Sequence, residues 1–112
     1  MSNLKISQQA SEVAIQNFKN KELVKKSIAL AFERTNTTVF NIENLIEDVL
    51  REFKHKDIEL ITKAIKNGSL GLYGKTYKLS TQEVCIWIRE YQKELDKLEK
   101  SKSYANPYDG QY

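Results

Sequence analysis

The sequence predicts an all-α fold: a single compact bundle of about five helices, with a Gly/Tyr-rich loop before a long C-terminal helix and a flexible tail. Of the 112 residues, 40% are hydrophobic and 29% are charged, which is typical of a folded chain. Four glycines and one proline provide too few turns for a many-stranded sandwich or barrel. Because domains commonly have about 100 to 150 residues, one domain is expected. Residues 1–102 should form it, followed by the flexible tail 103–112.

The N-terminal third of the chain predicts two helices. Residues 7–18 carry apolar side chains at loose helical spacing, with Ser7 or Ser11 available as an N-cap. Residues 21–34 continue with a second apolar pattern. Residues 35–38 are Thr-Asn-Thr-Thr, which favour turns and caps over helix interiors, so the second helix is expected to end there.

Two further helices are predicted between residues 41 and 68. Asn41 is an N-cap candidate for a stretch whose apolar residues fall on one helical face. That face comprises Ile42, Leu45, Ile46, Val49, Leu50 and Phe53. Asp57 is the N-cap candidate of the next helix, and Asn67-Gly68 is a typical C-terminal stop.

The segment 68–79, GSLGLYGKTYKL, places three glycines within seven residues. This density indicates left-handed backbone positions or a close approach of two chain segments. Its leucines and tyrosines are expected either to pack back onto the helices or to contribute to a small hairpin.

The last helix begins at a capping box, in which Ser80 and Glu83 satisfy each other's backbone amides. Its apolar residues then recur in steps of four and three, which is the spacing of a coiled-coil seam. They are Val84, Ile88, Tyr91, Leu95 and Leu98. The C-terminal half of this helix is therefore expected to pack against another helix or a second copy of the chain.

The tail contributes three more candidates for partner binding. Tyr104, Tyr108 and Tyr112 are spaced four apart and would share one face if the tail became helical on binding. Pro107 argues against a continuous helix and leaves an incidental tail as the alternative. The candidate partner-binding residues are thus Tyr91, Leu95, Leu98, Tyr104, Tyr108 and Tyr112.

No arrangement of residues predicts catalysis, a metal site or a cofactor. His55, the single histidine, has no neighbouring nucleophile, and Cys85 lies among apolar residues, as a buried structural thiol does. The glycine pattern at 68, 71 and 74 lacks the Lys-Ser/Thr ending of a P-loop. A single cysteine fits a reducing compartment, and the N-terminus reads as neither a secretory signal nor a membrane span. A cytoplasmic protein that is not an enzyme and does not enter a membrane is expected.

The net charge of +3 permits nucleic-acid binding without requiring it. Between residues 60 and 82 four lysines meet no acidic residue, and two tyrosines lie among them. Lysines neutralise phosphates and tyrosines stack on unpaired bases, so this segment is a candidate nucleic-acid site. The alternative is that the lysines are merely solvated and the tyrosines complete the core. The candidate residues are Lys63, Lys66, Tyr73, Lys75, Tyr77 and Lys78.

A second basic cluster lies at Lys19, Lys21, Lys25 and Lys26, interrupted by Glu22. It would add to the first cluster only if folding placed the two side by side.

The stretch 65–95 resembles small helical proteins of uncharacterised function from phages and mobile elements of gut bacteria. In those proteins a helix ends in a G-x-x-G-x-x-Y turn and a Trp-containing helix follows. The residues that carry the resemblance are Gly68, Gly71, Tyr73, Gly74, Tyr77, Trp87 and Tyr91. The resemblance covers about a third of the chain and implies a phage or mobile-element setting, but no activity that can be transferred.

The functional expectation is a non-enzymatic accessory protein of phage or mobile-element nucleic-acid metabolism, which binds DNA or a replication partner. The alternative is a protein-protein adaptor, an assembly component or a host-enzyme inhibitor that acts through the C-terminal helix and tail. A homo-oligomer is compatible with both, because a chain this short buries only part of its surface on its own.

Overall fold

A computed structural model describes the backbone of residues 2–38 and 41–105, and the side chains of residues 11–38 and 41–101. Within those ranges the chain is all helical: α1 (Ser2–Arg34), α2 (Ile42–Glu52), α3 (Ile58–Ser69) and α4 (Thr81–Ala105). The all-α class is confirmed. α4 continues three residues past the predicted end of the helical domain, and the remaining tail, 106–112, lies outside the described residues.

The described residues form four helices, so the expectation of about five is corrected. Residues 7–18 and 21–34 belong to one continuous helix, α1, of 33 residues. The expected break falls at Lys19 and Asn20, where there is neither a glycine nor a proline to interrupt the backbone hydrogen bonds.

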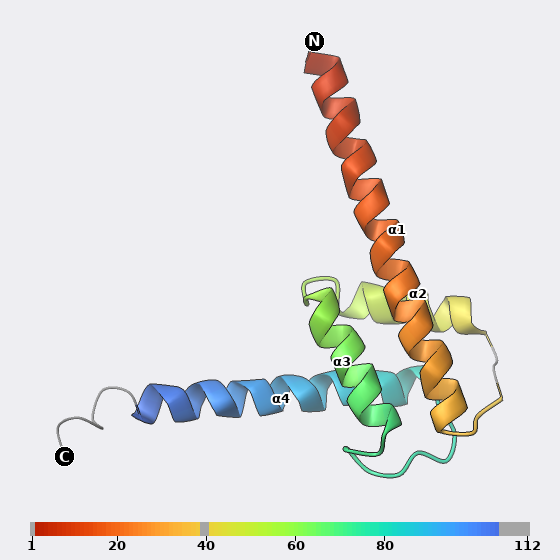
Figure 1. Cartoon of the computed structure of the whole chain (residues 1–112), viewed down its shortest axis with the longest axis vertical. Helices are drawn as coiled ribbons and strands as arrows, with labels where there is room; N and C mark the ends of the chain where they lie inside the picture. The colour runs from red at the N-terminus through yellow and green to blue at the C-terminus, as the bar shows by residue number, and fades with distance from the viewer. Residues whose placement is uncertain (1, 39–40, 106–112) are drawn as a thin grey trace.

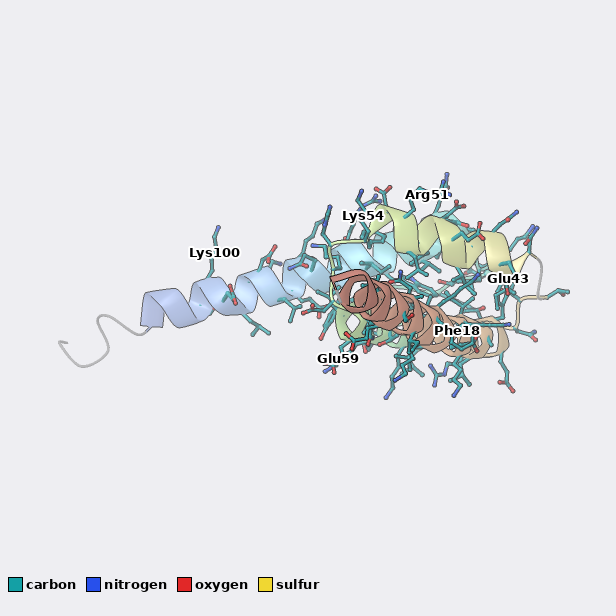
Figure 2. The ribbon with its side chains drawn as sticks, turned by 90° about the horizontal axis from the view of Figure 1, so that it is seen from above. Phe18, Glu43, Arg51, Lys54, Glu59 and Lys100 are labelled. Carbon is teal, nitrogen blue, oxygen red and sulfur yellow. The ribbon has the colours of Figure 1, made fainter. Side chains whose placement is uncertain are left out.

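The helices form two crossed layers. α1 and α3 lie side by side in front, and α2 and α4 run across them behind (Figure 1). Between the layers α1 packs against α2 and α3 against α4, and within the layers α1 packs along α3 and α2 contacts α4. Seen from above, Arg51 and Lys54 mark the α2 side and Glu59 the α3 side (Figure 2). The molecule is only 17 Å thick, against 59 and 48 Å in the other two directions, which fits two layers of helices.

The hydrophobic core lies where the layers cross. Its buried residues are Val24, Ile28, Ala31, Phe32, Leu45, Ile46, Val49, Phe53, Ile61, Ala64, Ile65, Leu79, Val84, Trp87 and Ile88. α1 contributes only from Val24 onward, and the fully buried residues of α4 end at Ile88. Both helices therefore extend beyond the core (Figure 1). We call residues 2–19 of α1 the N-terminal arm and residues 92–105 of α4 the C-terminal arm.

The helix starts agree in part with the predicted caps. The Asn41 side chain accepts a hydrogen bond from the backbone N–H of Asn44 at 3.3 Å. Asp57 occupies the N-cap position of α3, but its side chain makes no capping hydrogen bond. Ser80 Oγ accepts from the Glu83 N–H at 3.2 Å. The Glu83 carboxylate accepts from Thr76 Oγ1 at 3.4 Å.

The glycine-rich segment uses its glycines in two ways. Gly71 and Gly74 have φ angles of +85° and +111°, the left-handed conformations that glycine adopts without strain. Gly68 lies within α3 and serves the close approach of chain segments, because a Cβ built on it would overlap the ring of Trp87. Leu79 of this segment is buried, whereas Leu70 and Leu72 are exposed instead of packing back.

Candidate nucleic-acid interface

Lys63 and Lys66 lie on exposed positions of α3, one turn apart, at a groove between α3 and α1. The groove has a volume of about 430 Å³. It is lined by Ser27, Leu30, Arg34, Glu59, Thr62, Lys63, Lys66 and Asn67. Polar donors and cations thus surround one leucine, and Glu59 is the single acidic residue among these eight.

Arg34, which sequence reasoning did not single out, joins the two lysines at this groove. Its Nη1 donates a hydrogen bond to Ser69 Oγ at 3.0 Å, which connects the last turn of α1 to the last turn of α3. Ser69 is buried, whereas Arg34 stays exposed. Both helices present their C-terminal carbonyls here, so a cation at this end is also favourable for the helix dipoles. In the sequence, the only feature that pointed to Arg34 was its position as a basic residue at the end of a predicted helix.

Lys75, Tyr77 and Lys78 lie on the loop between α3 and α4. The Lys75 Nζ is 5.1 Å from the centroid of the Tyr77 ring, and 82% of the Tyr77 surface is exposed. Tyr77 and Lys78 also line a cleft of about 740 Å³ beside the connection between α1 and α2. The described clefts do not contain lysines from both the helix and the loop.

This loop is held in place although it has no regular secondary structure. Leu79 is buried, and its backbone N–H donates to Thr37 Oγ1 at 3.0 Å. The hydroxyls of Thr37 and Thr35 are also 3.0 Å apart. Tyr77 is therefore presented to solvent from a segment that is anchored two residues away.

Tyr73 is placed differently from the other five candidate residues. It is half-buried and packs against the core, and Asn67 Nδ2 donates to its hydroxyl at 3.4 Å. Burial raises the pKa of the Tyr73 phenol. Its ring is partly occupied by core contacts, which is the structural role considered as the alternative for the tyrosines of this segment.

The second basic cluster is divided between two sides of α1. Lys21 and Lys25 turn toward α2 and lie 3.4 and 3.5 Å from the Glu43 carboxylate. Lys26 precedes Leu30 of the groove by four residues, so it shares that face of the helix. Two of the four lysines thus pair with α2, and Lys26 lies outside the groove lining.

The candidate partner-binding residues of α4 become more exposed along the helix. Tyr91 and Leu95 are half-buried, and Leu98 is 60% exposed. Tyr104 belongs to α4, but its side chain lies outside the described residues, as do Tyr108 and Tyr112.

Cys85 lines a cleft of about 600 Å³ together with Asp48, Glu52 and Arg89. Cys85 is half-buried, and burial raises the pKa of its thiol, which disfavours the reactive thiolate. Among the described residues, no group of three or more His, Cys, Asp or Glu side chains is arranged to hold a metal ion.

None of the four helices, over the residues described, has the length and apolar character needed to cross a membrane. Comparison of the sequence with protein-family models, with curated proteins and with solved structures finds no match.

Proposed function

We propose that the protein is a non-enzymatic accessory protein of phage or mobile-element nucleic-acid metabolism, and that it binds the phosphate backbone along the α1–α3 groove. One observation carries the proposal: Arg34, Lys63 and Lys66 converge from two helices on one groove with a single carboxylate. Cations concentrated in this way neutralise phosphates and release counterions. The phage or mobile-element setting rests on the resemblance of residues 65–95.

The uncharged lining supports the same function. Ser27 offers a hydroxyl donor and Asn67 the second N–H of its side-chain amide, and both groups are common ligands of phosphate oxygens. These contacts do not read base edges, so binding through the groove is expected to depend little on sequence.

The loop supplies a second contact in this proposal. The exposed ring of Tyr77 lies next to Lys75 and Lys78, and an aromatic ring beside cations is the common platform for an unpaired base. The groove is thus assigned to the backbone and Tyr77 to a base of a single-stranded region.

The test is binding of fluorescent single- and double-stranded DNA across a series of salt concentrations. The double variant Lys63→Ala/Lys66→Ala should weaken binding and reduce the slope of log K against log salt for duplex DNA by about 1.8, which corresponds to two lost phosphate contacts. The matched control is Lys93→Ala/Lys97→Ala, which removes two exposed lysines from α4. Binding that is absent, insensitive to salt or weakened equally by the control would refute the proposal.

The base contact has its own test. Tyr77→Ala should weaken the binding of single-stranded DNA by about 1–3 kcal/mol and leave the binding of duplex DNA nearly unchanged. The reason is that only unpaired bases offer a free face for stacking. An equal loss for both substrates would show that Tyr77 does not stack on bases.

A second function, as a protein-protein adaptor, assembly component or host-enzyme inhibitor, is favoured by a separate observation. Leu98 continues the buried line of Val84 and Ile88 but is itself 60% exposed. An apolar row of side chains that extends beyond the hydrophobic core is suited to bind a partner protein. Capture of a protein partner by the wild-type chain, and its loss in Leu98→Glu, is the expected outcome. Equal capture by both proteins would exclude the seam as the contact.

A further inference from the structure

The seam of α4 runs in a straight line from the core into the C-terminal arm. Val84 and Ile88 are fully buried, Tyr91 and Leu95 are half-buried, and Leu98 is 60% exposed. Steps of four, three, four and three residues keep these side chains on one face of the helix. The core therefore covers the beginning of the seam and leaves its end uncovered.

The charges of the C-terminal arm are sorted around this seam. Glu94 precedes Leu95 and Glu99 follows Leu98, which places them at the two edges of the seam, whereas Asp96 and Lys97, between the leucines, lie farther round the helix. The exposed lysines Lys93, Lys97 and Lys100 fall on the remaining faces, and Lys102, four residues after Leu98, takes the next seam position. Figure 2 shows Lys100 standing on the side of the molecule opposite to Glu59 of α3. Glutamates rather than lysines thus border the surface that a partner would cover.

We propose that the occupant of this surface is a second copy of the chain, whose C-terminal arm pairs with the first in an antiparallel, two-fold symmetric contact. In the favoured register Leu95 of each copy lies opposite Leu98 of the other. This inference gives the adaptor or assembly function a specific partner and rests on that second proposed function, not on nucleic-acid binding.

The distribution of charge selects the antiparallel direction. In a parallel pair Glu94 of one copy would approach Glu99 of the other, which places like charges together along the seam. In the antiparallel register Glu94 approaches Ser101, and Glu99 approaches Gln92. Both of these residues are uncharged, so the second arrangement removes the repulsion.

The length of the arm selects the same register. When Leu95 lies opposite Leu98, the last helical residue, Ala105, falls opposite Ile88 of the other copy. Ile88 is the last fully buried residue of the seam. In this register position 102, a lysine, falls opposite Tyr91 of the other copy, and the helix ends where the other core begins. A self-complementary surface of this kind is what two-fold dimers use.

The experiment is a measurement of mass in solution over a concentration series. The wild-type chain should form a dimer. Leu98→Glu should raise the dimer dissociation constant by about 100-fold, because the substitution occurs twice in the symmetric contact. Lys97→Glu, one residue away on another face, is the matched control and should remain dimeric. Because Leu98 lies outside the core, both variants should keep the wild-type melting temperature at concentrations below the dimer dissociation constant.

The substitution Glu99→Lys tests whether the two arms pair antiparallel or parallel. Antiparallel pairing predicts an unchanged dissociation constant within about twofold, since Glu99 faces an uncharged residue. Marked tightening would indicate a parallel pair and overturn the register. A strict monomer at every concentration, or a dimer unaffected by Leu98→Glu, would overturn self-pairing altogether. The broader adaptor function is read separately, from whether the chain captures a different protein.

Discussion

At the scale of single residues, Gly68 is the position with the least freedom to change. A glycine inside a helix costs about 1 kcal/mol relative to alanine, so its presence in α3 requires compensation. The compensation is the contact with the Trp87 ring, which lies where a Cβ would stand. Trp87 itself is buried, and its Nε1 has no hydrogen-bond partner among the described atoms. The indole is therefore held by packing.

Gly68→Ala is expected to destabilise the fold by more than about 3 kcal/mol, because both the indole ring and the α3 backbone would have to move within a filled core. Gly74→Ala is the control. No atom lies within 4 Å of its built Cβ, and only the φ of +111° opposes a side chain. That strain costs about 1–3 kcal/mol. Urea unfolding of both variants measures the difference, and equal losses would mean that the Trp87 contact can relax.

The sequence predicts the need for these glycines but not the partner. Their density indicates either left-handed backbone or close approach, and both occur, at Gly71 and Gly74 on one hand and at Gly68 on the other. That Trp87 is the residue approached depends on how α3 crosses α4, which local spacing does not encode. The same holds for Arg34, which enters the candidate interface only because α1 and α3 end side by side.

At the scale of helices, strongly periodic segments were the ones predicted well. α2 and the start of α4 have buried faces as expected, because their apolar residues fall on one side. The N-terminal arm lacks such a buried face: Val13, Ile15 and Phe18 are all exposed, and Val13 lies on a different side of the helix from Ile15 and Phe18. Weak periodicity led to two short helices in the prediction, although nothing in the sequence at Lys19 and Asn20 ends a helix.

The contact between α1 and α2 should depend on pH through Glu43. A hydrogen bond with Lys21 and the nearby charges of Lys21 and Lys25 lower the pKa of this carboxyl below its ordinary value of 4.5. A lowered pKa in the folded state means that the ionised form stabilises the fold. The contribution is therefore present at neutral pH and is lost as the pH falls below 4.5 through the lowered pKa.

Glu43→Gln is expected to lower the melting temperature slightly at pH 7, and the difference from wild type should be smaller at a pH well below 4.5. The effect is small because both partners are exposed and surface ion pairs contribute little. Glu47→Gln, which removes another exposed glutamate of α2, should show no such dependence on pH. A constant difference between Glu43→Gln and wild type at both pH values would assign the effect to packing instead of charge.

At the scale of the whole molecule, the flat crossed shape explains why the residues of the predicted lysine-tyrosine segment do not line a single cleft. Lys63 and Lys66 follow α3 along the α1 groove, and Tyr77 and Lys78 turn toward the α1–α2 connection. A nucleic acid that used both sets would have to pass around the end of the molecule where α1 and α3 terminate (Figure 1). Double variants that combine the two sets would show whether one ligand spans them.

The arms should differ from the core in hydrogen exchange. Isolated helices of this length are marginal in water, because most helix stability in proteins comes from packing. Amides of residues 11–19 should therefore exchange much faster than those of residues 24–32, whose side chains include the core residues of α1. In α4, residues 84–91 should be protected at any concentration.

Hydrogen exchange of residues 95–101 distinguishes a C-terminal arm that pairs with a second copy from one that stays unpaired. If a second copy covers the seam, exchange of these amides should slow as the protein concentration rises, because pairing supplies the missing packing, and Leu98→Glu should abolish that slowing. Mass spectrometry of the wild-type chain and the Leu98→Glu variant at low and high concentration makes the comparison. Fast exchange at both concentrations would mean that a second copy of the chain does not cover this end of α4.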